Sequence, residues 1–444
     1  MMTSLIRAKT ILTLDDKDHI YQPGFLVIEN NRIIEVGQTE QLDPLRHFDS
    51  TLDLPDRLLM PGLINAHNHS PMVLFRGMAE GHSLFTFDGW FNTVRLVEQV
   101  MEPDMLPAAV TVSCAEMIRT GTTCFADQYF WMDHIVPQVQ KSQMRAVLCY
   151  GIVELGEKSA RDREIHSAGL FLDSVQGDPL ITGWLGPHAF FVDNSEDAIK
   201  MELKLADQYN AGLHFHLATS GEEDRYCQKN FGCSAAVRMK QIGLLDHRLL
   251  AAHGITVPQE DFALLSKHPF TIAAAPSSAM KNAAGFAPIK AMWQSGINLA
   301  LGTDNVTNNN SYDMFKEMQL LGKVTSMLER EVNVIPTREI IRMATMGGAK
   351  ALGMEKEIGS LETGKKADLI SLDLGEIGWA PHGFQDLYTS IVYSITGQHV
   401  RDVMINGEWV FRDDQLTKID YPSACVQMEA DCARLKKRVA SRPS

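Results

Sequence analysis

The 444-residue chain lacks the features that mark several classes of protein. No uninterrupted apolar run approaches the length of a membrane span. No basic run is present and the formal net charge is -14, which argues against nucleic acid and membrane surfaces as partners. The seven cysteines are scattered and contain no C-x-x-C pair, as expected for structural thiols in a reducing compartment. The first residues show no signal-peptide pattern, so we expect a cytoplasmic protein.

The composition is that of a large globular protein, with 45% hydrophobic and 22% charged residues. From about residue 58 onward, short apolar runs alternate with helical periods, which is typical of a parallel sheet covered by helices. Eight such units predict an α/β fold, a (β/α)8 TIM-like barrel. The expected strands are the run that ends in His67-Asn68-His69, then Thr122–Asp127, Arg145–Gly151, Ile181–His188, Gly212–Ala218, Leu249–Gly254, Phe270–Pro276 and Ile297–Asp304.

Both ends of the chain are rich in strand patterns. Asn30-Asn31 separates two apolar runs near the start, and Asn406-Gly407 divides a hairpin spanning Val400–Phe411. We therefore expect residues 1–57 and 367–422 to form one small β-sandwich domain beside a barrel of residues 58–366. A polar helix with a basic cluster, a solvated face or an oligomer contact, should occupy residues 423–444.

Three helices have clear ends in the sequence. Leu106 to Arg119 is closed by Gly121, and Ser195 is the expected N-cap of a helix that runs to Tyr209. A third helix should run from Thr337, as its cap, to Leu352.

The stretch before residue 70 carries the first chemical signal. Side chains alternate faces along a strand, so His67 and His69 should point to the same side. Two imidazoles on one face make half of a metal site, although an ordinary polar strand end has the same pattern.

Further polar residues stand where the later strands should stop, and in a barrel these ends converge on one mouth. They are Asp127, Gln128, His188, His214, His216, His253, Asp304 and Asn305. Imidazole and carboxylate ligands suit Zn²⁺ or Fe²⁺, which lower the pKa of a bound water toward about 7. Asp304 could bind the ion and accept the water proton, and His253 could orient the hydroxide or polarise the leaving group. Residues 181–191 contain no Lys that could bridge two ions, so we expect one.

The pattern resembles the amidohydrolase superfamily. It is most similar to the branch that contains methylthioadenosine/S-adenosylhomocysteine deaminases, guanine-type deaminases and triazine (atrazine) chlorohydrolases. The likeness spans nearly the whole chain and rests on the segments Pro61–His69, Phe75–Met78, Gly121–Gln128, Leu185–Ala189, Gly302–Asn305, Met343–Thr345 and Ile358–Leu369.

The resemblance implies a set of roles. The metal ligands fall on His67, His69, His216 and Asp304, and the strand-six histidine of the family falls on His253. Of the two histidines in the fifth strand, His216 matches the family ligand and His214 is its neighbour. Asp304, His253 and Thr219 are the expected catalytic positions. The expected substrate contacts are His188, Trp90, Gln128 and Asn305.

One departure from the family concerns catalysis. The branch normally reads His-Leu-Ala-Glu after the fifth strand, where the Glu carries a proton to the ring nitrogen, but this chain reads His216-Leu-Ala-Thr219. A threonine hydroxyl is neither an acid nor a base near neutral pH. Three alternatives follow. The substrate needs no ring protonation, or His188, Glu222 or Glu223 supplies the proton, or the protein binds a ligand without turnover.

Two other segments bear on the pocket. Ala274–Lys281 lacks the His and the Asn of the family pattern His-x-Pro-x-Ser-Asn, which indicates a changed substrate preference or neutral drift. The aromatic residues Phe85, Phe87, Trp90 and Phe91 follow the first barrel strand, where they could stack on a planar heterocycle or belong to the core.

These observations predict a mononuclear metal-dependent hydrolase of a nitrogen heterocycle, with Zn²⁺ as the default ion and Fe²⁺ as an alternative. Deamination of an aminopurine-, pterin- or triazine-like ring is favoured by the resemblance. The alternatives are hydrolysis of a C–Cl bond or of a cyclic amide or amidine, and non-catalytic ligand binding. The expected partners are a small heterocyclic substrate and further copies of the chain, as relatives in the branch are often oligomers.

Overall fold

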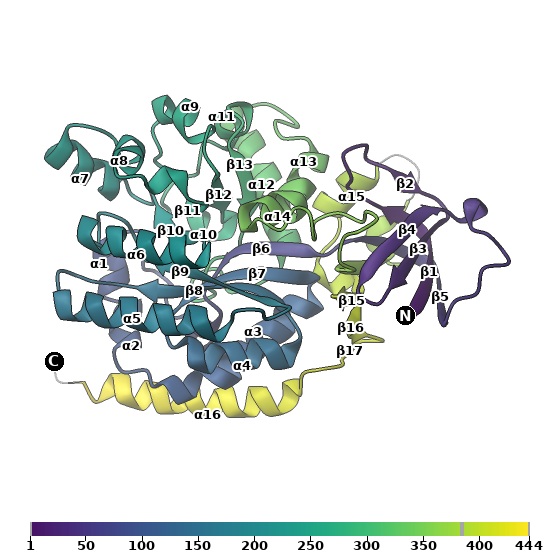
Figure 1. Ribbon diagram of the computed structural model, residues 1–444, viewed down its shortest axis with the longest axis horizontal. Coiled ribbons are helices and arrows are strands. Elements are labelled where there is room, and N and C mark those ends of the chain that lie inside the picture. The colour runs from purple at the N-terminus through teal and green to yellow at the C-terminus, as the bar shows by residue number, and fades with distance from the viewer. Residues whose placement is uncertain (1, 382–385, 443–444) are drawn as a thin grey trace.

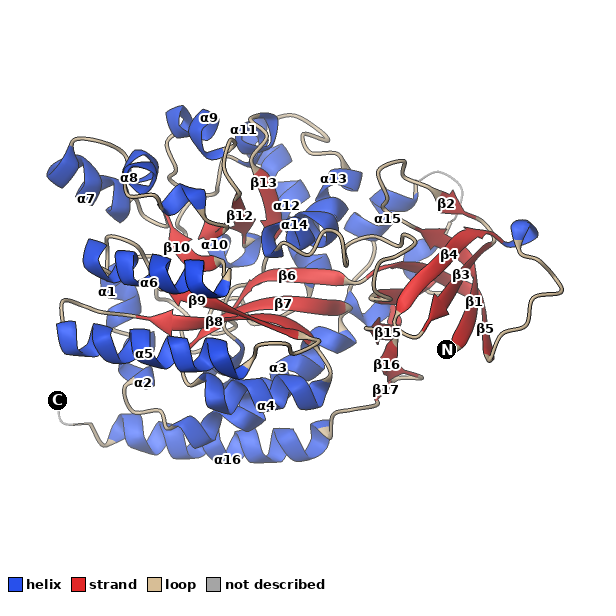
Figure 2. Ribbon diagram, viewed as in Figure 1, coloured by secondary structure: helices blue, strands red, loops and turns tan. Residues whose placement is uncertain are grey.

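An eight-stranded parallel sheet forms the centre of the molecule in the computed structural model, which describes residues 2–381 and 386–442. Its strands follow one another in chain order and curl into a nearly closed barrel surrounded by helices (Figures 1 and 2). They are β6 (Leu63–Asn68), β7 (Thr122–Tyr129), β8 (Arg145–Ile152), β9 (Ile181–Pro187), β10 (Leu213–Leu217), β11 (Leu249–His253), β12 (Phe270–Ala274) and β13 (Asn298–Leu301). All eight predicted strands are confirmed, with ends that differ by a few residues.

The barrel closes where its last strand meets its first. The backbone N–H of Asp304 donates to the carbonyl of His67 at 2.9 Å, and Asn65 accepts from the N–H of Thr303 at 3.0 Å. A Cβ at Gly302 would lie 2.7 Å from the Cβ of His67, so only glycine permits this approach. The closure brings His67 and Asp304 together although 237 positions separate them in the chain.

Helices lie in the connections between the barrel strands and in the part of the chain that follows the last barrel strand. They are α1 (Phe87–Phe91), α2 (Val94–Glu98), α3 (Leu106–Arg119), α4 (Met132–Ser142), α5 (Lys158–Ser174), α6 (Glu196–Tyr209), α7 (Glu222–Phe231), α8 (Ala235–Gln241), α9 (Phe262–Leu265), α10 (Pro276–Lys281), α11 (Ile289–Gln294), α12 (Met314–Glu329), α13 (Thr337–Arg342), α14 (Gly348–Leu352), α15 (Leu387–Tyr393) and α16 (Tyr421–Ala440).

The predicted helix ends can be compared with these bounds. Helix α3 has the predicted limits, and Ser195 caps α6 by accepting a hydrogen bond from the N–H of Ala198. The prediction for the third helix needs correction. Pro336 is its N-cap and Thr337 is already helical, because the fixed φ of Pro336 is suited to the residue that enters the helix. A π-helical turn at Met343–Gly347 joins α13 to α14.

A nine-stranded mixed sheet lies beside the barrel and combines strands from both ends of the chain (Figure 1). The N-terminal region provides β1 (Thr3–Leu12), β2 (Ile20–Tyr21), β3 (Gly24–Glu29), β4 (Arg32–Gln38) and β5 (Ser50–Pro61); the C-terminal region provides β14 (Leu369–Asp373), β15 (Val400–Ile405), β16 (Glu408–Arg412) and β17 (Gln415–Leu416). Strand β5 pairs with β1 and β14 and so joins the two chain ends. Strand β5 runs past residue 57, the predicted domain boundary, and only Gly62 separates it from β6. The division of the chain into domains stays a prediction.

Helix α16 crosses beneath the barrel, far from the small sheet at its C-terminal end (Figure 1). Two of its basic residues are paired within the chain, since Arg434 contacts Asp104 at 2.6 Å and Arg438 contacts Glu102 at 2.8 Å. These ion pairs attach the helix to the segment that precedes α3.

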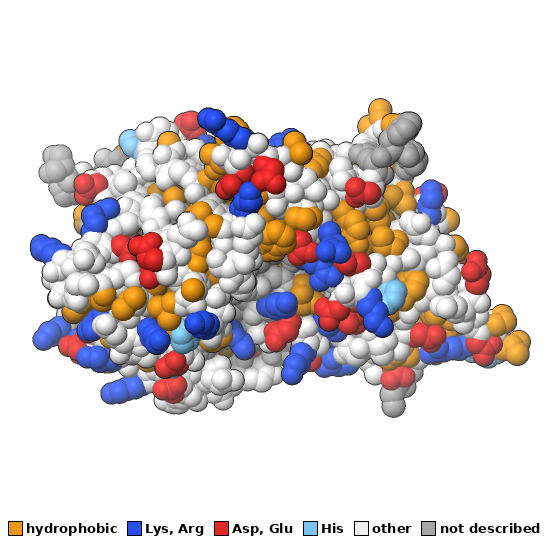
Figure 3. Space-filling model, turned by 90° about the horizontal axis from the view of Figure 1, so that it is seen from above, with side chains coloured by type: hydrophobic (Ala, Val, Ile, Leu, Met, Phe, Trp, Pro, Cys, Tyr) orange, Lys and Arg blue, Asp and Glu red, His pale blue; other side chains and the backbone are white. Residues whose placement is uncertain are grey.

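One face of the molecule carries charges of both signs. On the face drawn in Figure 3, Lys and Arg side chains are interspersed with Asp and Glu. Among the described residues, no helix is both long enough and apolar enough to span a membrane. All seven cysteines are free thiols.

Candidate active site

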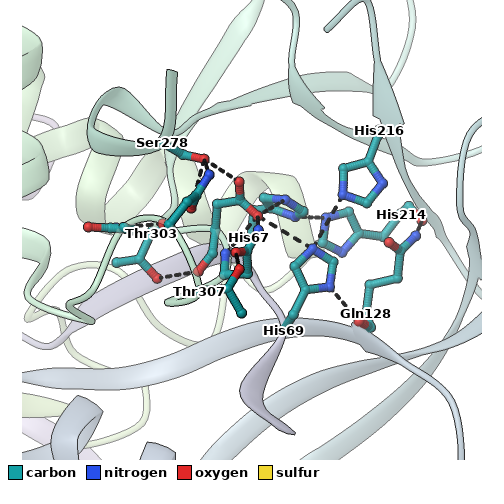
Figure 4. A network of polar contacts seen from close by, with 12 residues as sticks. His67, His69, Gln128, His214, His216, Ser278, Thr303 and Thr307 are labelled. Atoms are coloured by element: carbon teal, nitrogen blue, oxygen red, sulfur yellow. Dashed lines mark hydrogen bonds and ion pairs between the residues drawn. The ribbon is translucent and has the colours of Figure 1, made fainter. Parts of the chain in front are cut away.

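The carboxyl ends of four barrel strands bring together the polar residues that the sequence singled out. His67 lies on β6 with His69 directly after it, His216 lies on β10, His253 ends β11, and Asp304 follows β13. His67, His253 and Asp304 are almost completely buried, at 0%, 3% and 1% exposure. In Figure 4, His69, His214 and His216 lie on one side of His67, and Ser278 and Thr303 lie on the other.

Three short distances link the ligand atoms of His67, His69, His216 and Asp304. His67 Nε2 and His69 Nε2 lie 3.3 and 3.5 Å from Asp304 Oδ1, and His216 Nε2 lies 3.3 Å from His69 Nε2. Nitrogen or oxygen ligands stand about 2.0–2.1 Å from zinc, which places tetrahedral neighbours roughly 3.3–3.4 Å apart. The spacing therefore fits a single metal ion.

The other nitrogen of each imidazole is bonded elsewhere in the protein. His69 Nδ1 donates to the carbonyl of Gln128 at 2.7 Å, and His216 Nδ1 donates to the carbonyl of His188 at 2.8 Å. Each ring therefore presents an unprotonated Nε2, the form in which imidazole binds a metal. His67 Nε2 is buried without a hydrogen-bond partner among the described residues, as expected of a ligand atom.

His214 supports His67 in the same way, whereas the sequence had identified it only as the neighbour of the family ligand His216. His67 Nδ1 lies 2.9 Å from His214 Nε2, and His214 Nδ1 lies 3.6 Å from the Sγ of Cys149. His67 must donate in this pair if its Nε2 is to bind a metal, so His214 accepts at Nε2 and carries its proton toward Cys149. The alternation of β10, which places His214 and His216 on one face, was the available signal.

His253 belongs to a second, overlapping group. One ligand atom from each of His67, His216, His253 and Asp304 lies within 4.8 Å of the others, so geometry alone would also allow His253 as a ligand in place of His69. In the set with His69, three pairs of ligand atoms lie 3.3–3.5 Å apart, a separation typical of zinc ligands. The Nδ1 of His253 has no partner among the described residues, which leaves it available to a water or a substrate.

Electrostatics at the site favour neutral rings and an ionised carboxylate. Burial lowers the pKa of His69 to about 4 and that of His253 to about 3, and it lowers the pKa values of His214 and His216 well below the usual range. Burial alone would raise the pKa of Asp304, but the closely packed imidazoles of His67, His253 and His69 hold it well below the ordinary value.

Asp304 is held in place by neighbours from two segments. Ser278 donates from its hydroxyl to Oδ2, and the backbone N–H and side-chain amide of Asn305 donate to Oδ1 at 2.7 and 3.0 Å. Ser278 lies on α10, in the segment Ala274–Lys281 that lacks the His and the Asn of the family pattern. It matches the Ser of that pattern. The sequence interpretation missed this contact, although the Pro-x-Ser pattern was the signal.

The backbone beside the site adopts conformations that non-glycine residues rarely adopt. Ala218, His253 and Asp304 have φ values of 55°, 77° and 58°, each at or just after the end of a strand. Left-handed conformations of this kind cost on the order of 1–3 kcal/mol and cluster at functional sites.

A pocket extends from the histidines toward the loop after β6. Its walls include Phe85, Trp90, Arg95, Glu98, Gln128, Tyr129, His188, Asp193, Thr219, Glu222, Glu223 and Asn305, together with His69, His216, His253 and Asp304. The predicted residues His188, Trp90, Gln128, Thr219 and Asn305 therefore line one cavity, and their roles in binding or catalysis stay predictions.

Aromatic rings form one wall of the pocket. The ring of Trp90 stacks on that of His188 with 4.6 Å between centroids, and Phe85 lies 4.4 Å from His253. His188 donates from Nδ1 to Asp193, and this carboxylate raises the pKa of the imidazole against the effect of burial. The side chain of Phe87 lies outside the described part of the chain.

The side chains of Gln128 and Asn305 already make hydrogen bonds within the protein. The side-chain N–H groups of Gln128 donate to the carbonyls of Pro187 and His214 at 3.0 and 2.8 Å. The side-chain oxygen of Asn305 accepts from Thr307. These contacts brace the strand ends around the site.

The chain is similar to known proteins over most of its length. The profile of the amidohydrolase family matches residues 58–410. A 5-methylthioadenosine/S-adenosylhomocysteine deaminase of Thermodesulfovibrio yellowstonii is 32% identical over 427 residues, which cover 94% of this chain and 95% of the relative. A 5'-deoxyadenosine deaminase of Methanosarcina barkeri is 32% identical over 445 residues, which cover 99% of this chain and all (100%) of the relative.

A solved structure is also similar over its whole length. An adenosine deaminase from Xanthomonas campestris with bound zinc superimposes with a TM-score of 0.92 at 28% sequence identity, and the match covers 98% of this chain and 99% of the other.

Proposed function

The chain belongs to the amidohydrolase family, and from that premise we propose that it deaminates adenosine-like nucleosides. The reaction replaces the exocyclic amino group of the adenine ring with oxygen and releases ammonia. The observation that carries the proposal is the convergence of His67, His69, His216 and Asp304 at ligand spacing beside a pocket lined with aromatic rings. The names of the relatives supply the substrate class, since each of them acts on a modified or unmodified adenosine.

We propose that these four residues hold one divalent ion and that this ion is zinc. The three rings present Nε2 because their Nδ1 atoms are bonded elsewhere, and the donor set of three imidazoles and one carboxylate suits zinc. When bound, the ion supplies Lewis-acid chemistry and lowers the pKa of a coordinated water toward about 7. Zinc in the similar adenosine deaminase supports this choice.

Asp304 is the proposed base for the attacking water. Its carboxylate is ionised at neutral pH, and Ser278 and Asn305 fix its orientation, so it can take the water proton and later return it to the departing amine. His253 faces the same space with an unpartnered Nδ1 and is proposed to orient the water or the ring substituent.

The aromatic and polar residues of the pocket suit the base and the ribose of a nucleoside. Trp90 and Phe85 offer flat apolar surfaces for the purine. Glu98 also lines the pocket, 3.6 Å from Arg95 and beside Tyr129, and its oxygens can accept hydrogen bonds from sugar hydroxyls.

The proposal is tested with purified protein that carries a measured amount of zinc. Adenosine, 5'-methylthioadenosine, 5'-deoxyadenosine and S-adenosylhomocysteine are supplied, and ammonia and the change in ring absorbance are followed. We expect ammonia and the inosine-type product from at least one nucleoside. Stoichiometric zinc without ammonia from any of the four would refute the proposal.

Thr219 supports a second candidate function. Without a carboxylic acid at this position, a substrate that needs no ring protonation becomes more favourable, such as one that loses chloride or contains a cyclic amidine. A chlorotriazine and 6-chloropurine riboside belong in the same panel. Chloride release without ammonia release from any aminopurine would favour this candidate.

A further inference from the structure

Deamination requires a proton at the ring nitrogen as water adds to the neighbouring carbon. Transfer from a positioned acid contributes typically about 10²–10⁴ in rate. Thr219 lines the pocket but has no proton to give near neutral pH. Another group on the pocket wall must therefore act as the acid.

The carboxyl groups of the pocket differ in what they already contact. Asp304 belongs to the metal-ligand group, and Asp193 accepts from the ring of His188. Glu98 forms an ion pair with Arg95 and contacts Tyr129. Glu222 is partly exposed to solvent. Glu223 is buried at 2% exposure, and its Oε2 has no hydrogen-bond partner among the described residues.

Glu223 is close to the position at which the acid is missing. It lies in the first turn of α7, four residues after Thr219, and both side chains line the same cavity as His253 and Asp304. The backbone N–H of Ala218, directly before Thr219, is bonded to the Glu223 carboxyl group. One carboxyl oxygen is thus held by the loop while the other is left without a partner.

The surroundings favour the protonated form of this side chain. Burial raises the pKa of Glu223 to about 7, against the effect of the backbone N–H groups of Glu223 and Ala218. The negative charges of Glu222 and Asp224 on the same helix act in the same direction as burial. The other titratable groups on the cavity wall are His69, Arg95, Glu98, Tyr129, His188, Asp193, His216, Glu222, His253 and Asp304.

We propose that Glu223 is the general acid that protonates the ring nitrogen, a role that rests on the proposed deaminase function. Water adds its oxygen to the ring carbon and gives a proton to Asp304, while Glu223 gives its proton to the ring nitrogen as the C=N electron pair moves there. The carbon–amine bond then breaks, and ammonia leaves with the proton from Asp304. The new hydroxyl group loses its proton to Glu223 and becomes the carbonyl, so both carboxyl groups return to their starting states.

The first test replaces the acid with its isosteric amide. Glu223→Gln keeps an oxygen for the Ala218 N–H but cannot donate a proton from a carboxyl group, and we expect kcat to fall by about 10²–10⁴-fold with unchanged zinc content. The matched control is Glu202→Gln on α6. Glu202 is also a fully buried carboxyl group without a hydrogen-bond partner among the described residues, but it lies outside the pocket. We expect this control to keep the wild-type kcat.

A second variant separates proton transfer from a structural role in the loop. Thr219→Glu supplies a carboxyl group to the same cavity. When it is added to Glu223→Gln, we expect kcat to be at least about tenfold higher than that of Glu223→Gln alone. Recovery supports the proposal. If Glu223→Gln retains wild-type kcat, or if Thr219→Glu recovers nothing, Glu223 is not the acid.

The pH profile provides an independent measurement. The donor must carry a proton, so the kcat/KM of the wild-type protein should decrease as pH rises through about 7, the value to which the Glu223 pKa is raised. Glu223→Gln should lose this decrease, and its persistence would contradict the proposal. If the wild-type protein releases no ammonia from any nucleoside, the deaminase function itself fails, which is a different result from an active Glu223→Gln variant.

Discussion

At the scale of single residues, the site is defined by which atom of each side chain is already bonded. Nδ1 of His69 and His216 donates to backbone carbonyls, and Nδ1 of His67 faces His214. The Nε2 atoms and Asp304 Oδ1 therefore remain for a metal ion. Partners of this kind fix the tautomer of a ligand, and their removal typically costs about 10–100-fold in metal affinity or activity.

Asp304→Asn should abolish deaminase activity, with a decrease in kcat of at least about 10²-fold, because the amide cannot take the water proton. The measurement is ammonia release from the best nucleoside of the panel. Zinc content measured on the same sample distinguishes loss of the base from loss of the ion. Wild-type turnover by this variant would remove Asp304 from the mechanism.

His214→Phe should weaken zinc binding by about 10–100-fold, since the Nδ1–H of His67 loses its acceptor in a buried site. Competition with a chromophoric chelator measures the affinity. His247→Asn is the control, because His247 bonds to Asp207 at the surface and should leave the affinity unchanged. Equal affinities in both variants would show that His214 does not support His67.

At the scale of elements, the site depends on how closely neighbouring strands approach one another. Segments β13 and β6 are joined through the backbone of Asp304 and His67, and Gly302 lies against His67 at the contact. The ligand positions are thus set by the last and first strands of the barrel.

Gly302→Ala should separate these strands, because the new Cβ would meet the Cβ and backbone N of His67 at 2.7 Å. Overpacking of this kind costs typically about 1–3 kcal/mol. We expect a lower melting temperature and a reduced zinc content. Gly169→Ala on α5, where the nearest neighbouring atom is 3.9 Å away, is the control and should be neutral or slightly stabilising. Full zinc occupancy in Gly302→Ala would contradict the argument.

At the scale of the whole molecule, the barrel and the nine-stranded sheet are joined by a buried ion pair. Arg145 at the start of β8 contacts Asp368, which precedes β14, at 2.7 Å. Asp368 also accepts from the backbone N–H of Asn406 in the hairpin at 2.7 Å. The pair lies at the amino end of a barrel strand, opposite the end that carries the site.

Arg145→Met should lower the free energy of unfolding by about 3–5 kcal/mol, because it leaves the charge of Asp368 buried without its partner. The kcat of the folded protein should stay unchanged, since the site lies at the other end of the barrel. Denaturant titration and steady-state kinetics measure the two quantities. Adding Asp368→Asn should restore part of the stability, and a double variant less stable than Arg145→Met would contradict this account.

Much of the fold could be predicted because its signals are local. The apolar runs of the eight barrel strands and the Asn-Gly turn of the β15–β16 hairpin are each contained in a few consecutive residues. The same holds for the N-cap at Ser195. The cap at Thr337 was predicted wrongly because Pro336 competes for the same position.

The sequence by itself determined the barrel and the set of histidines and carboxylates at its mouth, because strand alternation and strand ends are properties of short segments. Only the tertiary structure decided that His214 supports His67, that Ser278 holds Asp304, and that Glu223 is buried with an oxygen left unpartnered. The physical reason is that these contacts and this burial come from segments distant in the chain, and closure of the barrel brings the segments together.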